Sequence, residues 1–314
     1  MQVPQYTDIE NAHLRIKDFI HRTPVLTSEN INRITGAQIF FKCENFQKVG
    51  AFKFRGATNA VLSLTDAMAQ NGVATHSSGN HAAALALAAR NRNITAYVVM
   101  PENAPSVKKE AVKSYGAQIT FCEATLESRE STLAKVIDQT GATEIHPYQN
   151  FWVIAGQGTA AKELLEETPL LDVVLCPVGG GGLLSGTAIS VKALSPLTRV
   201  IACEPAGADD AFRSFYGKRI FPSINPKTIA DGLLTSLGEI NYAIIKQQVD
   251  AVVTVSEEAI VEAMRLIWER MKMIVEPSSA VPLAAILEKK VDVEGLKVGI
   301  IVSGGNVDLS KLPF

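Results

Sequence analysis

The chain has 314 residues, of which 47% are hydrophobic and 20% are charged, as is typical of a globular protein with a large buried core. The formal net charge is −2, so no basic excess favours binding to nucleic acid or acidic lipid. No window approaches the roughly 18 uninterrupted apolar residues of a membrane-spanning helix. Residues 1–10 are polar and carry no apolar signal core, so we expect a cytoplasmic protein without membrane contact.

The four cysteines lie far apart, and no two of them form a Cys-x-x-Cys pair. The five histidines likewise lack the spacing of zinc ligands. We therefore expect Cys43, Cys122, Cys176 and Cys203 to be small buried thiols in a reducing compartment.

Short apolar runs alternate with longer amphipathic segments along the chain, without an internal repeat. The predicted strands are Ile39–Cys43, Val73–His76, Ala96–Met100, Ile119–Cys122, Val173–Val178, Val200–Cys203, Val252–Val255 and Val298–Val302. The predicted helices are Gly56–Ala69, Asn80–Arg90, Pro105–Tyr115, Leu126–Gln139, Gly158–Glu167, Leu183–Leu194, Glu257–Met273 and Ser279–Lys289. Strands of about five residues joined by helices predict an α/β fold with parallel pairing.

The predicted strands are continuously apolar, which is typical of a parallel sheet that is covered by helices on both faces. In such sheets, ligands bind beyond the carboxyl ends of the strands. Functional residues are therefore expected in the loops that follow the strands.

Lys53 lies between two phenylalanines in the segment Ala51-Phe52-Lys53-Phe54-Arg55-Gly56. Removal from water lowers the pKa of an amine and makes it a usable nucleophile or base. A surface lysine whose stem lies along apolar side chains gives the same local pattern, so this segment alone assigns no role.

The loop Ser77-Ser78-Gly79-Asn80-His81 joins a predicted strand to a predicted helix. Its hydroxyls, its carboxamide and the free N–H groups of a helix start suit a carboxylate ligand. A plain helix cap, in which Ser78 accepts hydrogen bonds from the helix, explains the same residues.

Four consecutive glycines, Gly179 to Gly182, lie between the apolar run 172–178 and the helix that begins at Leu183. Glycine lets the backbone turn its N–H groups inward, and the helix start adds the positive end of its dipole. The loop therefore predicts a phosphate cradle, with a flexible hinge as the alternative. No frame of the loop matches Gly-x-Gly-x-x-Gly, so the expected ligand is a compact phosphate monoester.

A looser dinucleotide fingerprint occurs at Gly156-Gln157-Gly158-Thr159-Ala160-Ala161. The next strand ends in Pro177-Val178-Gly179, without the acidic residue that would hold a ribose hydroxyl. No Gly-Lys-Ser/Thr phosphate-binding motif is present either. We interpret the match as coincidental.

The last predicted strand is followed by Ser303-Gly304-Gly305-Asn306. A serine at this position can present its hydroxyl to a ring nitrogen. Considered alone, the segment is better explained as a turn.

The lysine segment, the Ser-Ser-Gly-Asn-His loop, the tetraglycine loop and the Ser-Gly-Gly-Asn loop occur in an order that resembles the fold-type II pyridoxal-phosphate enzymes. The resemblance is to the serine racemase and serine/threonine dehydratase branch, and it covers nearly the whole chain. Further matching stretches are Thr23–Leu26, Ile154–Thr159, Thr228–Gly232 and Glu269–Lys272. The resemblance implies two open, twisted, mainly parallel sheets with helices on both faces, and a homodimer. It also implies a large domain of residues 1–70 and 147–314, with a small mobile domain of residues 71–146 inserted in it.

The resemblance also implies that pyridoxal 5′-phosphate is the cofactor and that Lys53 forms a Schiff base with it. Phe52 would pack near the ring, Asn80 would hold the phenolic oxygen, and Ser303 would face the pyridine nitrogen. A hydroxyl partner does not force that nitrogen to stay protonated, which suits elimination and racemisation better than transamination. The remaining cofactor contacts would be Gly179, Gly180, Gly181, Gly182 and Leu183 at the phosphate, together with Gly232.

The implied substrate is a small hydroxy amino acid. Its carboxylate would be surrounded by Ser77, Ser78, Asn80 and His81, with Arg129 and Thr235 nearby. In this branch the freed lysine removes the Cα proton from one face of the substrate. A dehydratase then loses the β-hydroxyl and releases a keto acid and ammonia, whereas a racemase returns a proton to the opposite face. Ser78 matches the residue of that opposite face, and a serine hydroxyl needs local activation for the task.

The stretch Glu204-Pro205-Ala206-Gly207-Ala208-Asp209-Asp210 matches the same branch. The resemblance implies that Glu204, the Ala208 carbonyl and Asp210 bind Mg²⁺, or Ca²⁺ or Mn²⁺, through hard oxygen ligands. A solvated acidic turn is the alternative.

The leading hypothesis is a serine racemase that also dehydrates L-serine and L-threonine. A threonine or 3-hydroxyaspartate ammonia-lyase without significant racemase activity is the close alternative, because Leu234-Thr235-Ser236 stands where racemases tend to carry a Ser-Ser pair. A NAD-dependent oxidoreductase and a cofactor-binding sensor without turnover are the alternatives from other classes. Family analogy alone suggests a nucleotide effector near Lys48.

Overall fold

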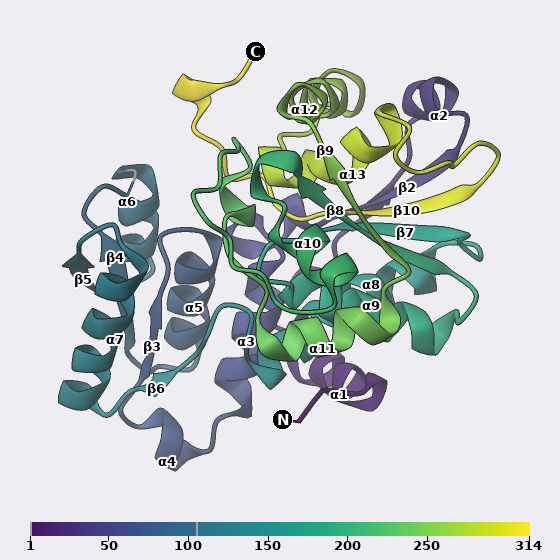
Figure 1. Cartoon of the computed structure of the whole chain (residues 1–314). Helices are drawn as coiled ribbons and strands as arrows, with labels where there is room; N and C mark the ends of the chain where they lie inside the picture. Colours follow the sequence, from purple (N-terminus) through teal and green to yellow (C-terminus); the bar gives the residue numbers. More distant parts are fainter. Residues whose placement is uncertain (1, 105) are drawn as a thin grey trace.

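Two separate β-sheets form the framework of the molecule (Figure 1). The computed structural model describes residues 2–104 and 106–314, so Met1 and Pro105, the first residue of one predicted helix, lie outside the described residues. The larger sheet has the order β1-β2-β10-β7-β8-β9, and the smaller sheet has the order β5-β4-β3-β6. The strands are β1 (Val25–Leu26), β2 (Gln38–Cys43), β3 (Val73–His76), β4 (Ala96–Pro101), β5 (Gln118–Cys122), β6 (Thr143–Glu144), β7 (Val173–Pro177), β8 (Arg199–Pro205), β9 (Ala251–Val255) and β10 (Lys297–Val302).

Parallel pairing dominates both sheets. The short edge strand β1 pairs with β2 in the antiparallel sense, whereas the other pairs of strands in both sheets run parallel. The predicted α/β fold with two mainly parallel sheets is confirmed. All four strands of the smaller sheet come from residues 73–144. The predicted domain boundaries and the mobility of the inserted unit stay predictions.

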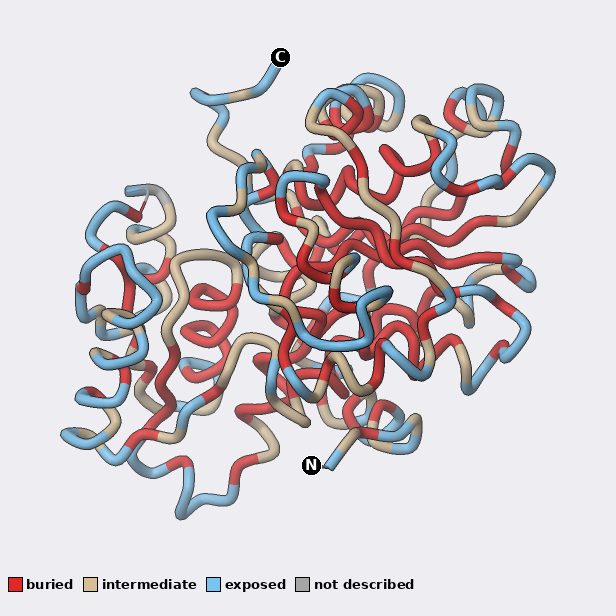
Figure 2. Tube along the Cα trace, in the orientation of Figure 1, coloured by how far each residue is buried: buried red, intermediate tan, exposed pale blue. Residues whose placement is uncertain are grey.

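Helices cover both faces of the larger sheet, and Figure 2 shows the resulting buried layers. One face packs against α2 (Glu29–Thr35), α12 (Glu257–Met271) and α13 (Pro277–Leu287). The other face packs against α8 (Phe151–Glu167), α9 (Gly182–Leu194) and α11 (Glu239–Gln248). Successive residues of β7 alternate between these two cores, as the pleat of a strand requires.

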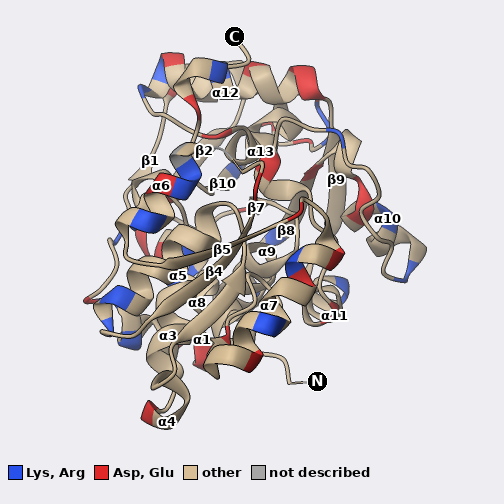
Figure 3. Cartoon of the chain, turned by 90° about the vertical axis from the view of Figure 1, so that its left-hand side faces the viewer, with Lys and Arg blue, Asp and Glu red and all other residues tan. Residues whose placement is uncertain are grey.

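The remaining helices surround the smaller sheet and the edges of the larger one. They are α1 (Tyr6–Ile16), α3 (Lys53–Ser63), α4 (Asp66–Ala69), α5 (Asn80–Asn91), α6 (Ser106–Ser114), α7 (Leu126–Thr140) and α10 (Asp210–Gly217). The 3-10 helices are η1 (Glu44–Phe46), η2 (Lys48–Gly50), η3 (Ala206–Ala208), η4 (Asp231–Leu233) and η5 (Leu309–Lys311). Acidic and basic residues are interspersed over the outer helices on the face shown in Figure 3. In the described ranges, no helix combines the length and the apolar character that crossing a membrane requires.

The observed elements correct several sequence predictions. The helix predicted at Gly56–Ala69 is two helices, because Leu64 is extended and the Thr65 hydroxyl caps a new helix by accepting a hydrogen bond from the Met68 N–H. The helix predicted to begin at Gly158 begins at Phe151 and continues through both glycines of the fingerprint. That fingerprint is therefore not a strand-to-helix turn, which confirms its interpretation as coincidental. The four cysteines are buried and unpaired, as predicted.

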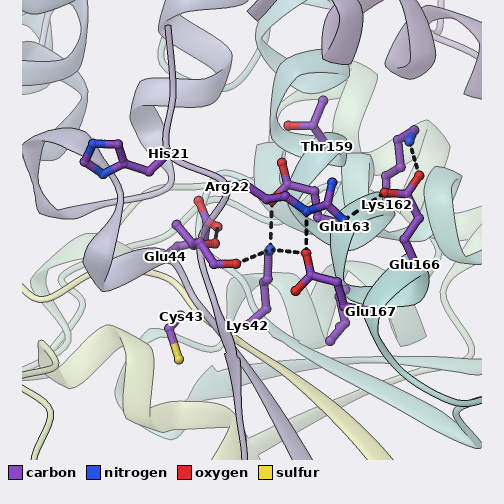
Figure 4. Close-up of polar contacts among 12 residues, drawn as sticks. His21, Arg22, Lys42, Cys43, Glu44, Thr159, Lys162, Glu163, Glu166 and Glu167 are labelled. Carbon is purple, nitrogen blue, oxygen red and sulfur yellow. Dashed lines mark hydrogen bonds and ion pairs between the residues drawn. The ribbon is translucent and has the colours of Figure 1, made fainter. Parts of the chain in front are cut away.

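A network of buried charges joins α3 to the larger sheet and to α8 (Figure 4). The Arg55 guanidinium lies between the carboxylates of Glu44 and Glu163, with contacts of 2.7–2.9 Å to each. Lys42, also fully buried, donates to Glu163 at 2.7 Å and to the Thr23 carbonyl at 2.6 Å. Two buried cations thus balance two buried carboxylates.

The pKa of Glu163 reflects this balance. Burial opposes ionisation, but hydrogen bonds from Arg55 and the charges of Arg55 and Lys42 outweigh it and lower the pKa to about 2. A carboxyl group whose pKa is lowered by folding stabilises the protein above its ordinary pKa, and this contribution disappears as the pH falls toward the folded value. The network therefore stays intact throughout the neutral range.

Replacing Arg55 with methionine should destabilise the fold strongly. Arg55→Met retains much of the apolar stem but leaves Glu44 and Glu163 buried without their cation, so the free energy of unfolding should fall by about 3–5 kcal/mol in urea denaturation. Arg22→Met is the matched control, because Arg22 is half-exposed and pairs with Glu166 and Glu167 at the surface. The control should cost less than about 1 kcal/mol, and equal losses would contradict the assigned importance of the buried network.

Candidate active site

Lys53 is the first residue of α3 and is only partly exposed. Its Nζ donates a hydrogen bond to the Pro147 carbonyl at 3.0 Å and lies 5.2 Å from the centre of the Phe52 ring. Burial lowers the pKa of Lys53 to about 8, although the nearby charge of Glu276 opposes this shift. A substantial fraction of the amine is therefore uncharged near neutral pH, as a nucleophile or base requires.

The Ser303 loop lies directly beside the segment that precedes Lys53. The Phe52 N–H donates to the Ser303 carbonyl at 2.9 Å, and Ala51 forms an isolated bridge with Gly304. The Ser303 hydroxyl is buried 2.9 Å from the hydroxyl of Ser279, which donates to the Gly304 carbonyl at 2.7 Å. Because the single proton of Ser279 is used there, Ser303 is the donor between the two hydroxyls. Sequence reasoning missed Ser279.

The tetraglycine loop forms a buried turn between β7 and α9. Within the described residues, no acceptor is found for the backbone N–H groups of Gly179, Gly180, Gly181, Gly182 and Leu183. Gly181 has a φ of +90°, and a Cβ on Gly180 would lie 2.4 Å from the Tyr148 ring. Five free amides at the start of a 13-residue helix fit a phosphate group, and the lack of space for side chains explains the glycines.

The Ser77–His81 loop forms the start of α5 after β3. The N–H groups of Ser78, Asn80 and His81 have no acceptor in the described part of the chain, so this helix start also suits an anion. The Ser78 side chain is half-buried. The His81 ring instead points to the Ile145 carbonyl, 3.0 Å from Nε2. Burial lowers the pKa of His81 to about 3, so the ring is neutral, and only the backbone of His81 is free to contact a carboxylate.

Glu276 is a site residue that sequence reasoning missed. It is buried next to the amide of Asn80, whose Nδ2 lies 3.1 Å from each carboxylate oxygen, and Asn80 Oδ1 accepts from Asn306 at 2.9 Å. Burial raises the pKa of Glu276 to about 7. An acidic residue directly before Pro277, which begins an apolar helix, was the available signal for a functional helix cap.

Arg129, Thr235 and Gly232 lie around the edge of this arrangement. Arg129, in α7, influences the pKa of His76 at the end of β3. Thr235 is exposed beside the Tyr148 phenol. The Gly232 N–H donates to the Ser278 hydroxyl at 3.1 Å, so this amide is already engaged.

The predicted metal ligands lie at the end of β8 and the start of α10. The Glu204 carboxylate accepts from the amides of Ala211 and Phe212 at 2.9 and 2.8 Å, and burial raises its pKa to about 9. Asp210 is also buried, and neither of its carboxylate oxygens has a hydrogen-bond partner among the described residues. Burial raises the pKa of Asp210 to about 6. Two acids that are costly to ionise fit a divalent cation.

A cation at this position would also need backbone carbonyls or water. In the part of the chain that the structure describes, no group of three or more His, Cys, Asp or Glu side chains is arranged for a metal ion. The predicted set of two carboxylates and the Ala208 carbonyl agrees with that limit. At the predicted nucleotide position, the Lys48 amine donates to the Phe19 carbonyl at 2.5 Å.

Comparison with known proteins identifies the family. Residues 16–304 match the family model described as "Pyridoxal-phosphate dependent enzyme". The chain belongs to this family. It is 54% identical to the β-hydroxyaspartate dehydratase of Paracoccus denitrificans, with all of both chains covered. It is 53% identical to the serine racemase of Dictyostelium discoideum, with 97% of this chain and 95% of the racemase covered.

Solved structures agree with the sequence relatives. The crystal structure of the Dictyostelium discoideum serine racemase has a TM-score of 0.92 at 53% identity and covers 97% of this chain and 99% of that one. The maize serine racemase has a TM-score of 0.97 at 46% identity and covers 98% of this chain and 95% of that one. A threonine deaminase, from the source abbreviated T.th., has a TM-score of 0.93 at 44% identity and covers 98% of this chain and all of that one. The predicted membership of the racemase and dehydratase branch of fold-type II enzymes is confirmed.

The attachment of pyridoxal phosphate to the apoprotein should depend on pH through Lys53. Because only the uncharged amine attacks the aldehyde, the attachment rate should rise about tenfold per pH unit below pH 8 and level off above it. Stopped-flow absorbance between pH 6 and 9.5 measures this rate. Glu276→Gln removes the negative charge that favours the protonated amine, so its inflection should lie at lower pH. An unchanged or higher inflection would show that Glu276 does not act on Lys53.

Proposed function

We propose that this protein is a pyridoxal-phosphate-dependent serine racemase that also dehydrates L-serine and L-threonine to a keto acid and ammonia. The observation that carries the proposal is the convergence of a buried amine at Lys53 with two helix starts whose amides are free. One helix start suits a phosphate and the other suits a carboxylate, and an amino acid bound next to pyridoxal phosphate needs both.

The residues of the chain have separate roles in this proposal. The amides of Gly179 to Leu183 hold the cofactor phosphate, Ser303 faces the ring nitrogen, and Phe52 and Asn80 contact the ring. Pyridoxal phosphate, when bound, supplies an electron sink that makes the Cα proton of the substrate acidic. The amine of Lys53 first holds the cofactor and then, once released by the substrate, accepts the Cα proton from one face.

Ser78 is proposed to act on the opposite face of the substrate. The half-buried hydroxyl lies in the loop whose amides suit the carboxylate, which would place it near Cα. The amides of Ser78, Asn80 and His81 bind the carboxylate, together with the Ser77 hydroxyl. Arg129 and Thr235, at the edge of the site, are placed to contact the β-substituent.

A 3-hydroxyaspartate ammonia-lyase is the second candidate function. The 54% identity over the full length of the β-hydroxyaspartate dehydratase favours it. In this case Arg129 would pair with the β-carboxylate of the substrate, because a guanidinium matches the geometry of a carboxylate. A homodimer, a cytoplasmic location and a nucleotide effector near Lys48 remain predictions of the family resemblance.

Chiral analysis of serine, combined with keto-acid detection for L-serine, L-threonine and 3-hydroxyaspartate, separates the candidates. Ser78→Ala should reduce conversion between the serine enantiomers by at least about tenfold, but it should affect water loss from L-serine less, because that reaction uses only the Lys53 face. Lys53→Ala is the control and should abolish both activities. Equal losses in Ser78→Ala would contradict the assignment of the two faces. Cofactor binding without turnover of any substrate would instead indicate a sensor.

We further propose that Glu204, the Ala208 carbonyl and Asp210 bind Mg²⁺, or Ca²⁺ or Mn²⁺, in a structural role. Neutralising two buried carboxylates should stabilise the fold by about 2.7 kcal/mol at a cation concentration 100 times the Kd. Thermal denaturation with and without EDTA, followed by added Mg²⁺, measures this effect. Asp210→Asn should abolish the response, whereas Asp209→Asn, which removes the same charge from the neighbouring residue, should retain it. A response that survives in Asp210→Asn would place the cation elsewhere.

A further inference from the structure

The motif Gly156-Gln157-Gly158 has no part in the proposed function, yet it lies at the centre of the helix layer next to the site. It belongs to α8, which packs against α3 and α9 (Figure 1). Helix α3 begins with Lys53, and α9 begins at the phosphate loop. The distance between the amine and the phosphate-binding amides therefore depends on how closely these two helices approach α8.

Helices α3 and α8 are in backbone contact at two glycines. A Cβ on Gly156 would lie 2.7 Å from the Gly56 Cα and 2.8 Å from the Arg55 carbonyl oxygen. In the reverse direction, a Cβ on Gly56 would lie 2.7 Å from the Val153 carbonyl oxygen. The Gly56 N–H also donates to Gln157 Oε1 at 3.1 Å. A side chain at either glycine would force the two helices apart.

The contact between α8 and α9 repeats this arrangement two residues later. A Cβ on Gly158 would lie 2.9 Å from the Gly186 carbonyl oxygen, and a Cβ on Gly186 would lie 2.4 Å from the Gly158 nitrogen. The Ser190 hydroxyl of α9 donates to the Gly158 carbonyl at 2.9 Å. Neither helix is able to move closer, and the hydrogen bond opposes separation.

Charge locks α3 onto α8 beyond the glycine contact. Arg55 follows Lys53 by two residues and donates to Thr159 at 3.2 Å and to Glu163 at 2.7–2.8 Å, both of which belong to α8. The first turn of α3 is thus fixed along the axis of α8 as well as in its distance from it. The Lys53 side chain inherits this position.

We propose that Gly156 and Gly158 are positioning residues that set the spacing between the Lys53 amine and the phosphate-binding amides. Pyridoxal phosphate carries its aldehyde and its phosphate on one rigid ring, so the two protein groups must match one fixed separation. This inference rests on the proposed role of Lys53. Alanine at either position increases the helix spacing and leaves the amine and the cradle intact but mismatched.

The test compares two aldehydes on the apoprotein. In each case the Lys53 nitrogen forms a C=N bond with the aldehyde carbon, and the carbonyl oxygen leaves as water. Pyridoxal phosphate must satisfy both groups at once, whereas pyridoxal with inorganic phosphate presents the two groups on separate molecules. Attachment is measured by the visible absorption band and, after borohydride reduction, by the mass of the peptide that contains Lys53.

In Gly156→Ala and Gly158→Ala, the ratio of pyridoxal phosphate attachment to pyridoxal attachment should fall at least about tenfold relative to wild type, since a displacement of about 1 Å costs up to about a hundredfold in a positioned reaction. Leu164→Ala is the destabilised control, because Leu164 is a buried residue of α8 that packs against the larger sheet. It should lower the melting temperature and keep the wild-type ratio. Ser190→Ala, which retains both glycines, should give an intermediate fall and covers the case in which the alanine variants do not fold.

The possible outcomes distinguish this inference from the proposed function. Wild-type protein that attaches neither aldehyde at Lys53 would overturn the proposed function. Wild-type attachment at Lys53, combined with unchanged ratios in the folded glycine variants or in Ser190→Ala, would overturn the spacing role alone. An equal fall in Leu164→Ala would show that the ratio reports general destabilisation and would likewise overturn it.

Discussion

The charge on Arg55, in the interior of the molecule, is the constraint on which the arrangement of the site depends. A buried guanidinium is tolerated only with full compensation, and Glu44 and Glu163 supply it from different elements. Glu44 follows β2, whereas Glu163 lies in α8. Arg55 therefore ties α3 to both the larger sheet and the helix layer beneath it. Lys53, two residues earlier, is positioned by the same contacts.

The molecule treats its buried ionisable groups in three different ways. Arg55 and Lys42 are neutralised by carboxylates, so they are inert and structural. Lys53 lacks a close carboxylate partner among the described residues, and burial lowers its pKa to about 8, which makes the amine reactive. Glu204 and Asp210 form no ion pair within the described part of the chain, and burial raises the pKa of both. The same physical cost of burial thus yields a scaffold, a nucleophile and a candidate cation site.

Parallel strand pairing brings the ligand-binding groups together. β7 and β10 are parallel neighbours, so the tetraglycine loop and the Ser303 loop leave the larger sheet at the same edge. The β3 loop approaches from the smaller sheet through hydrogen bonds that join Asn80 to Glu276 and Asn306. Two helix starts with free amides then face a region that already contains an uncharged amine. This combination suits an anionic cofactor and an anionic substrate.

The sequence by itself determined the fold class, the lysine, the phosphate loop and the family, because each depends on local composition and on the order of motifs along the chain. Continuous apolar strands and a run of glycines have few other uses. Ser279, Glu276 and the role of Gly156 and Gly158 were decided only by the tertiary structure. Ser279 and Glu276 look like ordinary residues at a helix start, and the two glycines resemble a nucleotide fingerprint. Their importance comes from what lies opposite them, a hydroxyl, an amide or a second backbone, and such partners from distant parts of the chain leave no signal in the local sequence.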